Sequence, residues 1–193
     1  MSTDRRLSEL VAMLLGSAGP VNSQFFREVE LKWGHPDDVV SGEGTFLHGN
    51  RFVPRGTHAV YASLTEETAL QEYNYGQASA YGRFFKPKAV HMTYPIDIRV
   101  ERAVDIRPFV FDPKFRDLIV KALEPGTHAT SQKLGAELIG RGAQAIFYPS
   151  AVPGHSGTNI VCILDSTPRP YVRVANYDDV LDQLAGIGGA RRP

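Results

Sequence analysis

The sequence predicts a compact domain of mixed helices and strands, with largely antiparallel strand pairing. Apolar residues alternate with period two along residues 90–100 and recur at helical spacing along residues 7–15, and turn residues separate such segments throughout the chain. Strands interspersed with helices and short turns are typical of an α+β domain. At 193 residues, the chain is long enough for one domain of ordinary size and too short for two substantial ones.

The N-terminal segment is predicted to form an amphipathic helix that ends near Gly16. Its apolar residues recur at helical spacing, namely Leu7, Leu10, Val11, Leu14 and Leu15. Glu9 interrupts the apolar stretch, which argues against a secretory signal peptide. We expect this helix to dock on the rest of the protein or to mediate a contact.

A break at Gly19-Pro20 is followed by a predicted strand at 25–29 and then by the polar, glycine-rich stretch 34–56, expected to be a long loop or hairpin. The next strand covers 58–64, with Tyr61 on the face turned away from the core. Thr65 is the expected N-cap of a helix that runs to about Tyr75.

The second half begins with the long strand 90–100, in which Pro95 is expected at an edge or a bulge. Asp112-Pro113 opens a helix that stops before Pro125-Gly126, and a second helix follows at 131–139. Strands are predicted at 144–148 and 158–164, and a final helix at about 178–185 leads into a basic tail.

Composition and charge exclude several classes of protein. Lys plus Arg and Asp plus Glu number 21 each, and this neutral balance argues against direct binding of nucleic acid. No apolar run approaches the roughly 18 residues needed to cross a bilayer, so we expect no membrane partner. The single cysteine, Cys162, excludes an internal disulfide and fits a reducing compartment, so a cytoplasmic location is expected.

Three residues in and after the glycine-rich stretch are candidates for binding and catalysis: Arg51, Tyr61 and Glu72. An arginine fork suits a diphosphate, and a tyrosine supplies a stacking face and a hydroxyl. A carboxylate beside a sugar C1 can stabilise an oxocarbenium-like transition state. From spacing alone, a loop salt bridge, a half-buried strand residue and a solvated helix residue explain the same three positions more simply.

Arg27 and Ser150 are further candidates. Arg27 follows two phenylalanines on a predicted strand, where a charge needs either a phosphate or a structural ion-pair partner. Ser150 lies at a strand end, where active-site residues often occur, although a turn serine is the simpler explanation. The chain has no G-x-S-x-G, P-loop or dinucleotide-binding fingerprint, and its six histidines lack the spacing of a metal site, so no metal is expected.

Five separated segments, in the right order, resemble the RES-domain family, which is named for its Arg, Glu and Ser residues. They are Phe26-Arg27, residues 41–56 with Gly49-Asn50-Arg51-Phe52, residues 59–72 with Tyr61 and Glu72, residues 142–150 ending in Tyr148-Pro149-Ser150, and Gly157-Thr158-Asn159. The resemblance covers roughly residues 22–170. It divides the chain into an N-terminal helix (1–18), a RES-type catalytic domain (19–175) and a C-terminal helix and tail (176–193).

The resemblance implies an ADP-ribosyltransferase-like fold with a split, mostly antiparallel β-sheet around a cleft for NAD. It implies a toxin that cleaves the nicotinamide–ribose bond of NAD as a phosphorylase or glycohydrolase, with NAD as substrate, inorganic phosphate as the co-substrate of phosphorolysis, and no resident cofactor. The implied partner is an Xre-type helix-turn-helix antitoxin, and a homodimer is left open.

By position, the resemblance makes Arg51, Tyr61 and Glu72 the catalytic residues, and Arg27, Ser150 and Asn159 residues that bind NAD or phosphate. Transfer of ADP-ribose to a protein is the main alternative, because it breaks the same bond with another acceptor. A domain that binds NAD or a partner without catalysis is the alternative from another class, and the presence of the three catalytic residues together argues against it.

Overall fold

The computed structural model describes residues 3–81, 89–124 and 128–180. Its strands are β1 (Gly19–Glu30), β2 (Ala59–Ser63), β3 (His91–Asp105), β4 (Ala145–Pro149), β5 (Thr158–Ile163) and β6 (Tyr171–Val174). Its helices are α1 (Thr3–Gly16), α2 (Pro36–Val39), α3 (Glu43–His48), α4 (Glu66–Tyr81), α5 (Arg116–Leu123) and α6 (Ala129–Gly140), with short 3-10 turns at Leu31–Trp33 and Arg107–Val110.

The strand pairings run in a circuit, from β1 to β2, β5, β4 and β3 and back to β1, with β6 added to β3. All of these pairings are antiparallel except the one between β3 and β4. The β1–β3 ladder is long, whereas β1 and β2 meet at a single pair, Phe26 with Ser63. The sheet is therefore split where β1 parts from β2, which confirms the predicted α+β fold with a split, mostly antiparallel sheet.

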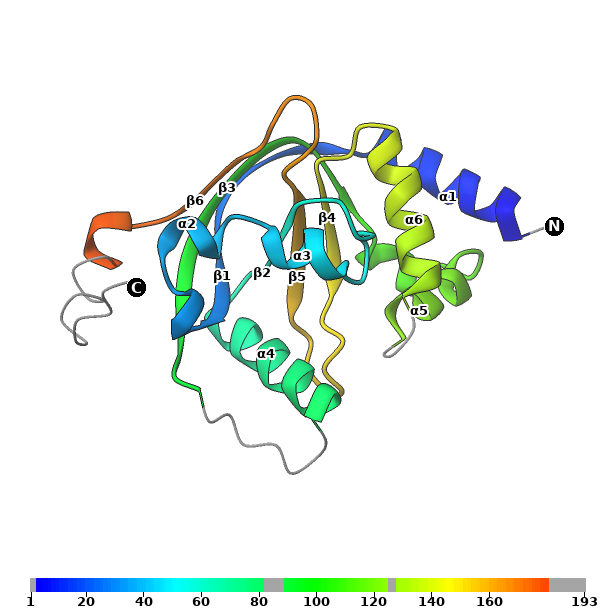
Figure 1. Ribbon diagram of the computed structural model, residues 1–193. Coiled ribbons are helices and arrows are strands. Elements are labelled where there is room, and N and C mark those ends of the chain that lie inside the picture. Colours follow the sequence, from blue (N-terminus) through cyan, green and yellow to red (C-terminus); the bar gives the residue numbers. More distant parts are fainter. Residues whose placement is uncertain (1–2, 82–88, 125–127, 181–193) are drawn as a thin grey trace.

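Apolar side chains pack on both faces of the central strands, because alternate residues of a strand point to opposite sides. On β2, Ala59 and Tyr61 face one cluster while Val60 and Ala62 face the other. The face that carries Tyr61 is thus also a core face, contrary to expectation. Helices α1, α5 and α6 cover it and gather at one side of the molecule, away from α2 and β6 (Figure 1).

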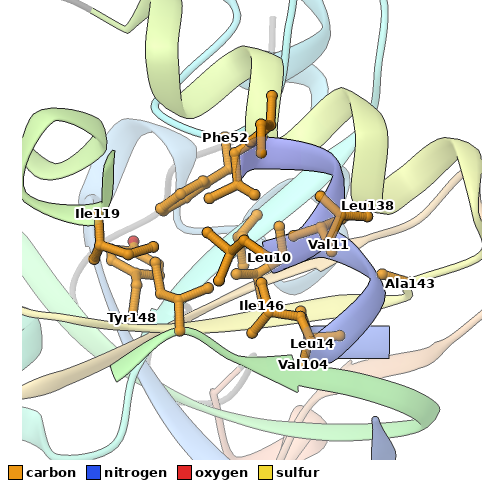
Figure 2. Close-up of a cluster of buried hydrophobic side chains, with 14 of the residues drawn as sticks. Leu10, Val11, Leu14, Phe52, Val104, Ile119, Leu138, Ala143, Ile146 and Tyr148 are labelled. Atoms are coloured by element: carbon orange, nitrogen blue, oxygen red, sulfur yellow. The ribbon is translucent and has the colours of Figure 1, made fainter. Parts of the chain in front are cut away.

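The N-terminal helix docks as predicted. Leu10, Val11 and Leu14 of α1 are fully buried and lie against residues of α6 and the central strands, among them Leu138 and Ile146 (Figure 2). Burial of each such side chain contributes about 2 kcal/mol to the hydrophobic stabilisation of the fold. The helix therefore shares one core with the strands that follow it.

Most of the predicted elements are confirmed, with boundaries that shift by a few residues. The Thr65 hydroxyl accepts a hydrogen bond from the Thr68 amide (3.2 Å), so Thr65 caps α4 as expected. Cys162 is a buried core residue, and burial raises the pKa of its thiol to about 12.

Four expectations are wrong or incomplete. Residues 34–56 contain helices α2 and α3 rather than one loop or hairpin, and β1 begins at Gly19, in place of the expected break. Pro95 pairs with Phe26 within a continuous register on a central strand, so it lies at neither an edge nor a bulge. Strand β6 is an element that the sequence patterns do not predict. The expected final helix lies mostly outside the described residues.

Candidate functional site

A cavity of about 560 Å³ opens where β1 and β2 part. Side chains from β1, β2, α4, β4, β5 and the loop after α3 line it. Five of the six residues singled out from the sequence are among them: Arg27, Arg51, Tyr61, Glu72 and Asn159. The structure thus brings together residues that are far apart in the sequence. The sixth residue, Ser150, does not line the cavity, but its hydroxyl lies 2.6 Å from Oε1 of Glu72.

The loop that carries Arg51 is a tight turn held against helix α6. Gly49 ends α3 with a φ of 68°, a left-handed conformation that favours glycine, and Asn50 and Val53 then bridge across the turn. The Asn50 Oδ1 atom accepts a hydrogen bond from the Arg51 amide (2.7 Å). The Arg51 guanidinium reaches the main-chain carbonyl of Ala122 at 3.3 Å. Nη1 also lies 3.5 Å from the Glu124 carbonyl oxygen, and among the described residues Nε and Nη2 of Arg51 have no hydrogen-bond partner.

Gly135 of α6 permits the close approach of this loop. A Cβ atom at position 135 would lie 1.8 Å from the Phe52 carbonyl oxygen, which is far inside van der Waals contact. We therefore expect Gly135→Ala to lower the free energy of unfolding by about 3 kcal/mol, as overpacking of a core does, measured by urea denaturation. Gly140→Ala on the same helix is the control, because nothing lies within 4 Å of its Cβ position. Equal stability of the two variants would contradict the proposed contact.

Arg27 is a partly buried cation that has no acidic partner among the described residues. Its Nη1 donates to the Tyr61 carbonyl oxygen (2.9 Å), and its buried Nε has no hydrogen-bond partner. Burial lowers the pKa of its guanidinium. Among the ion pairs of the described residues, none includes Arg27 or Arg51. A buried charge normally requires compensation, so this arrangement suits an anionic ligand in the cavity.

Tyr61 on strand β2 contacts the loop that carries Arg51. Its hydroxyl oxygen accepts a hydrogen bond from the Phe52 amide (3.1 Å), and burial raises the pKa of the phenol strongly. Its ring lies edge-on to that of Tyr148 at 6.4 Å between centroids. The Tyr61 phenol is therefore neutral, and its hydroxyl oxygen helps to hold the loop that carries Arg51.

Glu72 is held by three donors on one of its two oxygens. Oε1 accepts hydrogen bonds from the Ser150 hydroxyl (2.6 Å), the Asn159 side-chain amide (2.7 Å) and the Ala151 main-chain amide (3.1 Å). Among the described residues, no donor lies on Oε2. The network fixes the side chain and leaves one carboxylate oxygen for the cavity.

The loop that supplies two of these donors is itself anchored. The Ser63 hydroxyl donates to Asn159 Oδ1 (2.7 Å), which orients the amide so that its NH₂ group faces Glu72. The Thr68 hydroxyl of α4 lies 3.0 Å from Nε2 of His155 on the 150–157 loop. The first contact therefore links β2 to β5, and the second links helix α4 to the 150–157 loop.

Sequence reasoning missed several residues of the cavity. Tyr148 is buried beside Tyr61, Glu72 and both arginines, and burial raises the pKa of its phenol well above the usual value. His128 lines the same cavity. The position of Tyr148 before Pro149-Ser150, at the end of a predicted strand, is a signal that could have found it, whereas nothing near His128 in the sequence marks that residue.

No group of three or more His, Cys, Asp or Glu side chains among the described residues is arranged to hold a metal ion. None of the helices in the described ranges has both the length and the apolar character that a membrane span requires.

Fold and cavity together define a class of protein: an α+β domain whose split sheet presents a carboxylate and two arginines that form no ion pair with a described residue. The family model described as the RES domain matches residues 25–182, and the chain belongs to this family. The fold is similar to that of a chain in the crystal structure of the M. tuberculosis MbcT-MbcA toxin-antitoxin complex. The TM-score is 0.64 at 15% sequence identity, and the match covers 95% of this chain and 100% of that chain. No curated protein matches the sequence.

Proposed function

We propose that this protein is the toxin of a toxin–antitoxin system and that it cleaves the nicotinamide–ribose bond of NAD. The observation that carries the proposal is the pairing of two features in one cavity. Within the described part of the chain, Arg27 and Arg51 have no acidic partner, and one carboxylate oxygen of Glu72, which lines the same cavity, accepts no hydrogen bond. A dinucleotide has a diphosphate for the first feature and a reactive ribose carbon for the second.

The bond to be broken needs little acid catalysis, because the nicotinamide of NAD is a cationic leaving group. As the C1–N bond breaks, its electron pair goes to the ring nitrogen, and positive charge develops on the ribose. A fixed carboxylate next to this carbon stabilises that charge more in the transition state than in the ground state. In the proposed mechanism Glu72 has this role, Arg27 and Arg51 hold the diphosphate or an attacking phosphate, and Tyr61 packs against nicotinamide or ribose.

Water or inorganic phosphate then forms the new bond to the ribose carbon. With water the product is ADP-ribose and a proton is released, and with phosphate it is a phosphorylated ADP-ribose. Asn159 lines the cavity and is proposed to contact the substrate as well as Glu72. For Ser150 the geometry favours positioning of Glu72, since its hydroxyl donates to Oε1.

Removal of the Ser150 hydroxyl tests this positioning role. We expect Ser150→Ala to lower kcat about tenfold with little change in KM, because one of three hydrogen bonds to a catalytic carboxylate is lost. Ser156→Ala, on an exposed position of the same loop, is the matched control. A rise in KM at constant kcat would instead assign Ser150 to substrate binding.

The toxin role and an antitoxin partner are supported by membership of the RES family and by the similar fold of a chain from a toxin–antitoxin complex. We propose an Xre-type helix-turn-helix protein as the partner, acting in the cytoplasm by covering the cavity. Expression of the chain with and without the protein encoded beside it tests this part. Growth arrest that the neighbouring protein relieves is the expected result.

Product analysis tests the activity. Purified protein is incubated with NAD, with and without inorganic phosphate, and the products are identified by mass spectrometry. Free ADP-ribose indicates hydrolysis, and phosphorylated ADP-ribose indicates phosphorolysis. A gain in mass on an added protein indicates the alternative, transfer of ADP-ribose to a protein target. No release of nicotinamide under any condition would overturn the proposed activity and favour a non-catalytic NAD-binding domain.

A further inference from the structure

His128 lies at the start of α6, but its side chain takes no part in starting the helix. Its main-chain carbonyl accepts hydrogen bonds from the Gln132 amide (2.7 Å) and the Ser131 hydroxyl (3.0 Å). The imidazole makes no capping hydrogen bond, although a side-chain acceptor commonly fills that role at this position. The local fold therefore does not explain why a histidine stands here.

The ring lines the same cavity as Arg51 and has no hydrogen-bond partner among the described residues. Its Nδ1 atom is buried and unpaired. The other nitrogen, Nε2, is not among the buried unpaired atoms and makes no hydrogen bond to a described residue, so it is the accessible nitrogen of the ring. The described residues give Nε2 no hydrogen-bond partner, so this nitrogen is free to meet a polar ligand in the cavity that the ring lines.

The surroundings fix the charge and the tautomer of this ring. Burial and the positive charge of Arg51 both lower the pKa of His128, burial being the larger cause. At neutral pH the imidazole is therefore uncharged and carries one N–H. Buried N–H groups without an acceptor are rare in native proteins, so the proton belongs on Nε2 and the lone pair on the enclosed Nδ1. The ring then presents a neutral donor to the cavity.

We propose that His128 is a ligand-binding residue whose Nε2–H donates a hydrogen bond to a phosphoryl oxygen held by Arg51. This inference rests on the proposed function, because it assumes that a phosphorylated ligand occupies the cavity. A neutral donor suits the position next to Arg51, because in the unliganded protein a second positive charge there would be repelled by the Arg51 guanidinium. His128 thereby extends the phosphate-binding side of the cavity from the loop that carries Arg51 to the start of helix α6.

Ligand binding by variants tests this role without depending on catalysis. ADP is the probe, because it contains a diphosphate and lacks the nicotinamide–ribose bond. We expect His128→Ala to weaken ADP binding about tenfold in isothermal titration calorimetry, the effect of one good hydrogen bond. His128→Gln should stay within about threefold of the wild type, since the glutamine amide supplies a neutral donor. His48→Ala, an exposed histidine at the end of α3, is the control.

Inorganic phosphate serves as a second probe and separates the two sources of a phosphoryl oxygen. A loss confined to ADP assigns the contact to the diphosphate, and a loss confined to phosphate assigns it to the attacking co-substrate. Wild-type affinity for both probes in His128→Ala would overturn the proposal.

Nitrogen NMR of the wild-type protein gives an independent measurement that needs no variant. The expected signal is a neutral Nε2–H imidazole at pH 7 that shifts when ADP is added. An imidazolium or an Nδ1–H tautomer at that pH would overturn the assignment. If ADP binds through His128 while NAD releases no nicotinamide, the inference stands and the proposed function fails. If nicotinamide is released while ADP binding does not depend on His128, the proposed function stands and the inference fails.

Discussion

Glu72→Gln is expected to lower NAD turnover about 10³-fold while substrate affinity stays within about threefold. The glutamine carbonyl oxygen can accept the hydrogen bonds of Ser150, Asn159 and the Ala151 amide, so the side chain keeps its place. What the variant loses is the negative charge that would face the ribose as the bond breaks. The expected pattern is a fall in kcat at nearly constant KM, measured by nicotinamide release.

Glu67→Gln, an exposed carboxylate in the first turn of the same helix, is the matched control for charge and should turn over like the wild type. Affinity is measured separately with ADP by calorimetry, so that a folding defect is recognised. Turnover within tenfold of the wild type in Glu72→Gln would remove Glu72 from its proposed role.

Arg27→Met is expected to weaken ADP binding about 100-fold and yet leave the unliganded protein as stable as the wild type or more so. Hydrogen bonds to charged groups contribute about 1.5–3 kcal/mol each, so the loss of this donor from the anion site has a large effect on binding. In the free protein, by contrast, the guanidinium is partly buried, has no acidic partner among the described residues, and has a buried Nε without a hydrogen-bond partner. A methionine of similar length removes that desolvation cost and retains the packing.

The opposite signs of the two effects make this prediction specific. Arg55→Met removes the same charge from the same region of the chain, but Arg55 is exposed and its Nε donates to the Leu47 carbonyl oxygen (2.7 Å) away from the cavity. It should bind ADP like the wild type. If Arg27→Met unfolded more readily and bound ADP normally, Arg27 would be a structural residue rather than part of an anion site.

Local patterns in the sequence predict the elements that local physics determines. The period-two alternation of 90–100, the Thr65 cap and the apolar face of 112–122 depend on near neighbours, and the structure confirms each of them. Strand β6 and the first residues of β1 exist because long-range partners on β3 supply their hydrogen bonds. Such pairing leaves little trace in composition.

Pro95 is a second case in which distant strand pairing decides the outcome and local sequence does not reveal it. Its missing N–H predicts an edge, but its position depends on which strands flank β3, and the sequence alone does not reveal that order. The glycine-rich stretch misleads for a related reason, because short helices such as α3 depend on packing and caps rather than on propensity.

At the candidate site, the sequence identifies residues by their chemical type, and the structure shows which of them contact one another. Arg27, Arg51 and Glu72 can be found because charged residues stand in unusual places and because the family resemblance selects them. That Ser150 supports Glu72 could not be foreseen, since a side chain 78 positions away is its partner. His128 is missed because the observation that singles it out, a ring without a hydrogen-bond partner among the described residues, exists only in the three-dimensional structure.

The closed circuit of strands also determines when the cavity can form during synthesis of the chain. The cavity combines Arg27, near the start of the chain, with Asn159 on β5, and the β1–β3 ladder cannot form before residues 91–105 have been synthesised. Ladders between distant segments are slow to form and come late in folding. A chain that stops before β5 therefore lacks Asn159 and one of the three donors to Glu72, and the cavity cannot be complete until residues 158–163 have been synthesised.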